Sequence, residues 1–403
     1  MKRRAGSPAR IAESIAHTLA APDPGQVNNP QRHSLATGDL GTALAHIERA
    51  HIGVGDWQTV HAWVTAAAGD TIGAADTGAY FGAPALSVLL HAAGADGVPR
   101  YGATLAALDA HLAIMVHRRA DAAMNRIDRR DDATFGEYDL FRGLTGLGAH
   151  LLHRAPGTSA LERILVYLVA LTKPNQRNGE RFPGWWVSHD PHLRQASGGG
   201  HANLGVAHGI AGPLALLAQA MRRQVTVAGH TEAITTILDW LDRWQQTTNS
   251  GPWWPQWITL SELRTGRPSS RGPHRPSWCY GTPGIARAQQ LAGIALGDET
   301  RQRAAENALT ACLSDPQQLR QIRDNSLCHG WAGLYQTAWR SAQDARTPAV
   351  LAHLPHLAHH LCQERVGGEQ QGLLEGQAGR LLALHTAVHG APRTGWDAYL
   401  LLN

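Results

Sequence analysis

The 403-residue sequence lacks the features of a membrane protein, a secreted protein or a disulfide-stabilised domain. It has only 4 Cys and 4 Phe, and no apolar run approaches the roughly 18 residues of a membrane-spanning helix. The basic start, Met1–Arg4, is not followed by the apolar segment of a secretory signal. We therefore expect no membrane span and a cytoplasmic location, where cysteines favour metal or catalytic chemistry over disulfides.

The charge pattern lacks the signature of a nucleic-acid-binding protein. The formal net charge is +4, and the 36 basic residues, nearly all Arg, are dispersed along the chain. Since no basic stripe with interleaved aromatic residues occurs, nucleic acid is not an expected partner. A mildly basic surface is still compatible with an acidic peptide.

Glycine, alanine and leucine are abundant, and glycine recurs in a fixed pattern. Seven Gly-x-x-Gly motifs are each followed by an apolar run, although Ala85 replaces the second glycine of the second copy. The first glycines stand at positions 38, 82, 143, 209, 281, 330 and 376, at intervals of 44 to 72 residues. A motif that returns at such intervals is typical of a repeat architecture.

Helical periodicity between the copies predicts the repeat unit. Stretches such as Ser159–Leu171 and Glu232–Trp244 have the composition and spacing of amphipathic helices. Each unit then consists of an outer helix, a turn, the glycine motif and an inner helix. Seven such hairpins predict an all-α protein, an α/α toroid closed on itself, with an open solenoid as the alternative.

The sequence also predicts a division of the chain. Residues 1–33 are expected to form an N-terminal extension with one helical stretch near Ile11–Leu19, and residues 34–403 the toroid domain. Long loops near 173–200 and 248–276 are rich in Pro and Trp. Long loops in a compact domain are usually functional or disordered. Their tryptophans could form a rim or lid over the mouth of the toroid, or could simply fill its interior.

Cys279, Cys328 and His329 lie next to the glycine motifs of two neighbouring repeats. Thiolate sulfur and imidazole nitrogen suit Zn²⁺, and three protein ligands on a tetrahedral ion leave one position open, as in catalytic sites. These residues therefore predict one zinc ion per chain. Cys312 and Cys362 lie in helical stretches without the motif, and we expect them to be ordinary buried thiols.

Four further residues are candidates for catalysis. His208 stands immediately before a glycine, as His329 does, and should point into the same mouth. Asp139, four residues before Gly143, could orient a histidine or could cap a helix. Arg275 and Tyr280 could stabilise a developing anion or could serve only in packing.

A zinc ion with an open position supports two kinds of reaction. It can lower the pKa of bound water for hydrolysis, or it can bind a substrate thiol as a nucleophilic thiolate. Two thiolate ligands make the metal a poorer Lewis acid for water. The ligand set therefore favours sulfur alkylation.

Three segments together resemble the signature blocks of the lanthionine synthetase C-like family, which includes the lanthipeptide cyclases. They are Ala207–Gly212, Trp278–Gly284 and Leu327–Gly333. The resemblance implies an α/α toroid with zinc in its mouth. It also implies intramolecular Michael-type addition of peptide cysteines to dehydroalanine or dehydrobutyrine, which gives (methyl)lanthionine thioether rings.

The resemblance assigns roles to the candidate residues. Cys279, Cys328 and His329 match the zinc ligands, and His208 matches the acid/base that handles the thiol proton or protonates the enolate. Asp139 would be its partner or an alternative acid. The remaining two candidates, Arg275 and Tyr280, match residues that line the site.

The resemblance also implies partners. The substrate would be a dehydrated precursor peptide with a leader and a core. A length of 403 residues leaves no room for a fused dehydratase, so the chain resembles a stand-alone class I cyclase. A separate dehydratase and an exporter are expected partners, with peripheral association with a membrane-bound biosynthetic complex.

Two other functions stay open at this stage. One is a non-catalytic scaffold of the same family that retains zinc and binds a thiol such as glutathione, or a peptide. The other is prenyltransferase-like thiol alkylation, which would be expected to use a carboxylate ligand that this Cys/Cys/His set lacks. The alternation of apolar and polar residues is too weak to place a β-rich insertion for leader binding.

Overall fold

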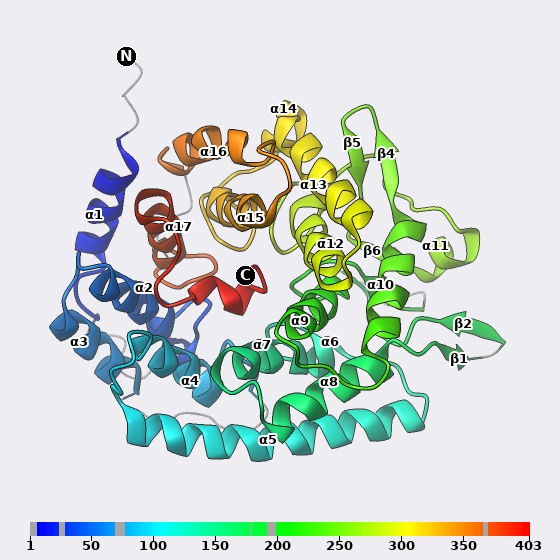
Figure 1. Ribbon diagram of the computed structural model, residues 1–403, viewed down its shortest axis with the longest axis horizontal. Helices are drawn as coiled ribbons and strands as arrows, with labels where there is room; N and C mark the ends of the chain where they lie inside the picture. Colours follow the sequence, from blue (N-terminus) through cyan, green and yellow to red (C-terminus); the bar gives the residue numbers. More distant parts are fainter. Residues whose placement is uncertain (1–5, 24–28, 69–76, 178, 192–198, 366–369) are drawn as a thin grey trace.

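The computed structural model describes residues 6–23, 29–68, 77–177, 179–191, 199–365 and 370–403. Their main helices form two concentric layers around one axis (Figure 1). The inner layer consists of α2 (Asp39–His51), α4 (Gly82–Ala93), α7 (Leu144–Arg154), α9 (Ala211–Arg222), α12 (Thr282–Leu296), α15 (Trp331–Asp344) and α17 (Gln377–His389). The outer layer consists of α1 (Pro8–Thr18), α3 (Trp57–Ala68), α5 (Gly102–Asp128), α8 (Ser159–Leu171), α10 (His230–Trp244), α13 (Glu299–Ser314) and α16 (Leu354–Leu361).

Each inner helix packs against the outer helix that follows it in the sequence, as α2 does against α3 and α12 against α13. The seventh inner helix, α17, packs against α1 and also against α2, which closes the ring. This closure confirms the predicted all-α toroid of seven hairpins and excludes the open solenoid. The short helices α6 (Phe135–Tyr138), α11 (Leu260–Thr265) and α14 (Pro316–Leu319) lie in the connections, with 3₁₀ turns at Pro30–His33, Leu351–His353 and Trp396–Leu400.

Helix α1 is the outer partner of the last inner helix. Its apolar side chains Ala12 and Ile15 are buried, and Glu13 pairs with Arg49 of α2 at 2.9 Å. The sequence boundary at residue 34 leaves this helix in a separate extension, whereas its packing includes it in the toroid. The difference arises because α1 carries no glycine motif and its partner, α17, lies at the other end of the chain.

The second glycine of the motif has a steric role. In the six copies that have it, an added Cβ would come within 1.9 to 2.6 Å of the carbonyl oxygen six residues earlier, closer than real Cβ contacts. In the sixth copy that oxygen belongs to Leu327, next to Cys328. The first glycine stands directly before the helix at α2, α7, α12, α15 and α17. Glycine is therefore needed because the preceding segment folds back onto the first turn of each inner helix.

Backbone hydrogen bonds join these folded-back segments from one repeat to the next. Their N···O distances are 2.9 to 3.3 Å, and they run from Leu35 N to Tyr80 O, Leu373 N to Leu35 O, Cys328 N to Leu374 O, Cys279 N to Cys328 O, Val206 N to Cys279 O and Leu140 N to Ala207 O. The main chain thus places neighbouring repeats in register at the mouth of the toroid.

The C-terminal segment fills the centre of the toroid, where Figure 1 marks the end of the chain. Trp396 and Leu400 are fully buried. The indole N–H of Trp278 donates to the Leu400 carbonyl at 2.9 Å, and the guanidinium of Arg287 donates to the Leu402 carbonyl at 2.9 Å. The inner helices therefore enclose a packed segment of the same chain.

Short β-strands that the sequence analysis did not place occur in and directly beside the two predicted long loops. Antiparallel pairs form between β1 (Asn175–Arg177) and β2 (Glu180–Phe182), between β3 (His201–Asn203) and β6 (Trp257–Thr259), and between β4 (Gln246–Thr248) and β5 (Gly251–Trp253). Three-residue strands are too short to show a period of two in the sequence. Part of the first loop, residues 192–198, lies outside the described residues.

Four of the five tryptophans of these loops are buried packing residues, and the fifth, Trp257 of β6, is half-buried. Trp185, Trp186, Trp253 and Trp254 are all buried. Trp185 packs edge-to-face on Trp240 of α10. Trp254 donates its indole N–H to a backbone carbonyl of α10 at 2.9 Å. They therefore join the strand pairs to the outer layer.

In the described part of the chain, no helix has the length and apolar character needed to cross a membrane.

Candidate metal centre

The three predicted metal ligands lie together at the mouth of the toroid. One ligand atom from each of Cys279, Cys328 and His329 lies within 4.8 Å of the others. Cys279 precedes α12, and the other two precede α15, so a metal would join neighbouring repeats. Zn–S bonds of about 2.3 Å and Zn–N bonds of about 2.0 Å separate tetrahedral ligands by roughly 3.5 Å. The donor types and their spacing fit zinc.

Asp324 orients the histidine ligand. Its Oδ2 lies 3.3 Å from Nε2 of His329, which leaves Nδ1 as the ring nitrogen for a metal. A carboxylate on the far nitrogen fixes the tautomer of a metal-binding histidine. The hydrogen bond to Asp324, with a weaker one to Cys279, raises the pKa of His329 to about 9. Asp324 is itself held by the Ser326 backbone N–H at 2.8 Å.

The two thiols share a hydrogen bond that shifts their pKa values in opposite directions. A hydrogen bond from Cys328 lowers the pKa of the Cys279 thiol to about 5 against the opposing effect of burial, and His329 and Ser277 lower it further. The pKa of Cys328 rises in turn, because its proton is held in that hydrogen bond. The pair therefore holds one thiolate readily even before a metal cation is considered, which favours metal binding.

His208 is held beside this cluster by Asp139. Nδ1 of His208 lies 2.7 Å from Oδ2 of Asp139, whose side chain is fully buried. The other carboxylate oxygen, Oδ1, accepts backbone N–H bonds from Arg142 and Gly143 at 2.7 and 2.9 Å. Asp139 thus contacts the histidine with one oxygen and, with the other, holds the turn that precedes α7, whose first turn has no side-chain cap. Nε2 of His208 is left for a substrate.

Aromatic rings restrict the imidazole of His208 further. Phe135 stacks on it at a centroid distance of 5.2 Å, Phe141 packs edge-on at 5.0 Å, and Tyr280 lies at 6.4 Å. The backbone brings this residue near the cysteines, because the N–H groups of Val206 and Ala207 both donate to the Cys279 carbonyl.

Tyr280 and Arg275 carry donors near the same cluster. Burial raises the pKa of Tyr280, so its phenol stays protonated, and its oxygen accepts from Asn203 Nδ2 at 3.3 Å. Arg275 makes no ion pair within the described residues. Its positive charge acts to lower the pKa of Cys328 and of His329, which places it within electrostatic reach of the ligands.

The structure brings all seven predicted site residues to one end of the inner helices and adds others that the sequence analysis missed. Asp324, Ser277, Asn203 and Phe135 touch a predicted ligand or catalytic residue. The sequence signal that could have identified Asp324 was its position, as an acidic residue shortly before the Cys-His pair. The remaining two cysteines, Cys312 and Cys362, are buried away from the cluster.

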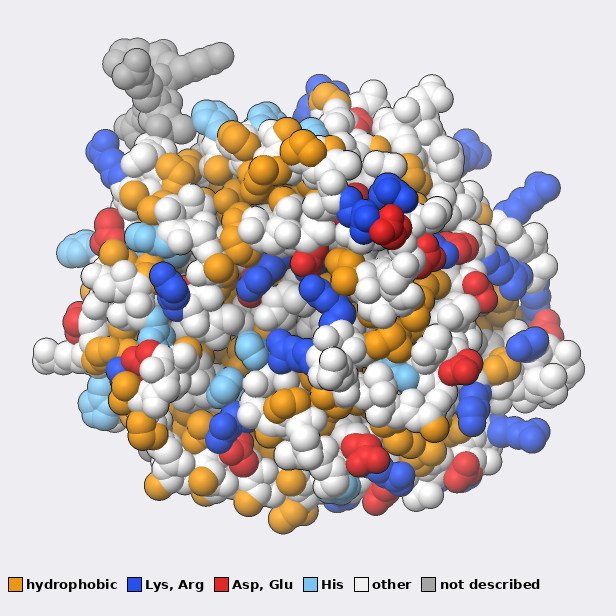
Figure 2. Space-filling view, in the orientation of Figure 1, with side chains coloured by type: hydrophobic (Ala, Val, Ile, Leu, Met, Phe, Trp, Pro, Cys, Tyr) orange, Lys and Arg blue, Asp and Glu red, His pale blue; other side chains and the backbone are white. Residues whose placement is uncertain are grey.

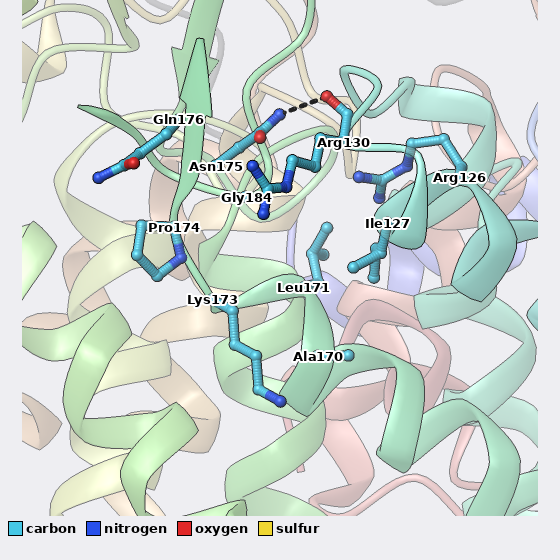
Figure 3. A pocket seen from close by; sticks show the side chains of 10 residues that line it. All are labelled: Arg126, Ile127, Arg130, Ala170, Leu171, Lys173, Pro174, Asn175, Gln176 and Gly184. Carbon is cyan, nitrogen blue, oxygen red and sulfur yellow. Dashed lines mark hydrogen bonds between the residues drawn. The ribbon is translucent and has the colours of Figure 1, made fainter. Parts of the chain in front are cut away.

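A hollow on the outer side of the toroid is separate from this centre (Figure 3). It has a volume of about 230 Å³ and lies between the C-terminal ends of α5 and α8 and strand β1. Its lining includes the basic residues Arg126, Arg130 and Lys173, and none of the predicted site residues. It therefore contributes nothing to the metal centre.

The structure defines an α/α-toroid protein of seven helical hairpins with a Cys/Cys/His cluster at its mouth. Comparison with known proteins gives its family. The family model described as "Lanthionine synthetase C-like protein" matches residues 29–401. The chain belongs to this family.

Two relatives can be named. The chain is 24% identical over 282 residues to the nisin biosynthesis protein NisC of Lactococcus lactis subsp. lactis. That alignment covers 68% of this chain and 66% of the relative, just under two thirds of its length. A solved structure described as nisin cyclase matches with a TM-score of 0.80 at 20% identity, over 98% of this chain and 97% of the other. At that identity the structural match supports the fold.

Proposed function

We propose that this protein is a zinc-dependent lanthipeptide cyclase that closes thioether rings in a dehydrated precursor peptide. Membership of the lanthionine synthetase C-like family supports the proposal. The single geometric observation that carries it is the Asp139–His208 pair, which stands beside the Cys/Cys/His cluster with one imidazole nitrogen left for substrate. A scaffold that only bound thiols would not need such a pair.

The proposed reaction adds a cysteine S–H across the Cα=Cβ bond of dehydroalanine or dehydrobutyrine. An S–Cβ bond forms, the π electron pair moves towards the neighbouring carbonyl to give an enolate, and a proton is finally delivered to Cα. No oxidant or reductant is required. Zinc held by Cys279, Cys328 and His329 would stabilise the substrate thiol as a thiolate at neutral pH.

The side chains of this chain have separate roles in that addition. Asp139 holds Nδ1 of His208, so Nε2 is the atom that accepts the thiol proton or delivers a proton to Cα. Arg275 and the neutral phenol of Tyr280 supply N–H and O–H donors for the oxygen on which negative charge develops. The dehydrated peptide would come from a separate dehydratase, and an exporter would take the product.

The proposal is tested with purified protein and a dehydrated peptide that contains cysteine. We expect about one zinc per chain, and its loss in Cys279→Ala. Ring closure leaves the peptide mass unchanged, so it is followed as the loss of thiols that can be alkylated. Absence of zinc in reduced, chelator-free protein would contradict the proposal. Zinc-dependent binding of the peptide without loss of thiols would favour the thiol-binding scaffold.

A further inference from the structure

A second cavity lies at the opposite end of the inner helices from the metal ligands. It has a volume of about 350 Å³. Arg222, the last residue of α9, and Asp344, the last residue of α15, line it, whereas the metal ligands precede the first turns of α12 and α15. Figure 2 shows basic side chains gathered near the centre of this face, beside the end of the chain marked in Figure 1.

The lining is dominated by guanidinium groups from three inner helices, those of Arg222, Arg223, Arg287 and Arg340. Two carboxylates oppose them. Asp344 lies 3.3 Å from Arg222 and 2.7 Å from Arg287, and Asp397 pairs with Arg340. Four cations against two carboxylates leave an excess of two positive charges among these side chains, and the α-carboxylate of Asn403, which also lines the cavity, reduces the local excess to one.

Arg223 has no carboxylate partner among the described residues. Its Nη1 donates to the Leu152 carbonyl at 2.8 Å, which leaves other N–H groups of the same guanidinium for a ligand. Arg223 is an exposed residue, and partial desolvation together with the neighbouring Arg222 cation lowers its pKa from the usual value. A bound anion would relieve the repulsion between these two cations.

Gln219 supplies an independent indication of a ligand. It lines the cavity, only 5% of it is exposed, and its Nε2 has no hydrogen-bond partner in the described part of the chain. Buried amide groups almost always have a partner, so an orphaned N–H donor that faces a cavity indicates a missing acceptor. This donor stands among four cations, and within the described residues the Oδ1 acceptor of Asn403, which also lines the cavity, lacks a partner as well. The missing group is therefore an anion that can also donate a hydrogen bond, as a protonated phosphate can.

The arginines are held in place without a ligand. Arg287 is 1% exposed and bonds to Gln290 and to the Leu402 carbonyl of the central segment. Arg222 is the last residue of α9, where the partial negative charge of the helix stabilises a cation. Arg340 is held by its ion pair with Asp397. The site is therefore preorganised, which lowers the entropic cost of binding.

We propose that this cavity binds a phosphate group, either as inorganic phosphate or as the phosphate of a mononucleotide. A phosphate anion carries the charge opposite to the local excess, and its tetrahedral oxygens can accept from arginine forks and from the Gln219 amide together. A single carboxylate has only two oxygens. This binding site is independent of the proposed cyclase activity.

The test is calorimetric titration of the zinc-loaded protein with inorganic phosphate and with AMP, each paired with a thermal unfolding scan. We expect saturable binding and a rise in the unfolding midpoint with ligand concentration. Tighter binding of AMP would identify a nucleotide as the ligand, and equal or weaker binding would identify free phosphate. Cys328→Ala, which removes the metal, should bind phosphate equally and so excludes binding at the zinc.

Gln219→Glu is the decisive variant, because its carboxylate would occupy the anion position. It should weaken phosphate binding at least about tenfold, as expected when a hydrogen bond to a charged group is lost. It should also raise the unfolding midpoint in phosphate-free buffer. Gln317→Glu, the same change at an exposed position of helix α14, should behave as the wild type.

A variant at a partly exposed position covers the case in which Gln219→Glu does not fold. Arg222→Gln, at a side chain that is 30% exposed, should fold and should weaken phosphate binding about tenfold. Absence of phosphate and AMP binding to the wild type at millimolar concentration would overturn the proposal. Unchanged affinity in both variants, or binding of a glutamate-rich peptide in place of phosphate, would overturn it too.

Discussion

The backbone N–H of Cys279 donates to the carbonyl oxygen of Cys328 across the boundary between two repeats, at 3.3 Å. The main chain therefore brings the two sulfur ligands together without help from a metal. The same bond belongs to the series that links the folded-back segments around the mouth. Metal binding and folding should consequently be separable in this protein, unlike in small zinc domains that unfold without the ion.

Removal of one thiol tests this separation. Cys328→Ala should lose bound zinc and ring-closing activity while the helical toroid survives, because the metal joins only two adjacent repeats. Metal analysis and circular dichroism on the same sample check both points. Cys362→Ala removes a buried thiol outside the cluster and should keep the zinc. Global unfolding of Cys328→Ala would show that the metal is needed for the fold.

The role of His208 is separable from metal binding. His208→Asn should retain zinc but slow ring closure by roughly 10²–10⁴-fold, the scale of a lost general acid or base. The rate is measured as the decay of alkylatable peptide thiols under single-turnover conditions. His111→Asn, at an exposed position on α5, should leave the rate unchanged. A wild-type rate in His208→Asn would remove this residue from the mechanism.

Two substitutions of Asp139 should separate its two roles. Asp139→Asn keeps an oxygen for the N–H groups of Arg142 and Gly143 but loses the charge that orients His208. We expect slower ring closure with little change in stability. Asp139→Ala leaves the buried N–H of Gly143 without a partner and should also lower the free energy of unfolding, by about 1–3 kcal/mol. Urea titrations and rate measurements on both variants check this; equal stability of the two would exclude a structural role for Asp139 in the turn before α7.

The glycine at the start of α15 should not tolerate a methyl group. A Cβ on Gly333 would lie 1.9 Å from the Leu327 carbonyl, so Gly333→Ala must displace the segment that carries Cys328 and His329. We expect a loss of more than about 2 kcal/mol of unfolding free energy and weaker zinc binding. Gly157→Ala, where an added Cβ meets nothing within 4 Å, should change stability by less than about 0.5 kcal/mol. Similar stabilities of the two variants would contradict this steric account.

Buried neutral histidines should make the protein sensitive to acid. Burial, together with nearby His91, lowers the pKa of His150 to about 3, and burial together with Arg49 lowers the pKa of His385 to about 3. In the unfolded chain both titrate near 6.5. Between pH 3 and pH 6.5 the unfolded state binds more protons than the folded state. The contribution of these two histidines to the free energy of unfolding is therefore fully present above pH 6.5. It is lost as pH falls towards 3, by up to about 1.4 kcal/mol per pH unit for each histidine.

Unfolding midpoints in denaturant at several pH values between 7 and 4 check this prediction. His150→Gln should show a shallower decline than the wild type, because one of the groups that takes up a proton on unfolding is gone. A free energy of unfolding that stays constant over this range would contradict the assignment of neutral, buried imidazoles.

Local patterns in the sequence predicted the elements that depend on local physics. Ser159–Leu171 is helical over the predicted residues because its apolar spacing and the capping Thr158 act within a few turns. The glycine motifs marked the starts of inner helices because a close backbone approach leaves no room for a side chain. Cys279, Cys328 and His329 could be chosen because their chemistry is specific to metals and their positions relative to those glycines are shared.

Tertiary structure alone decided which distant groups meet. Asp324 reaches His329 through a turn whose geometry the sequence does not reveal, and α1 finds its partner α17 only when the ring closes. The paired short strands and the central C-terminal segment also depend on contacts between residues far apart in the chain. The sequence by itself therefore determined the repeat, the inner helices and the choice of candidate metal ligands. Long-range packing determined how those ligands are oriented, buried and paired, because these properties belong to contacts that no local pattern encodes.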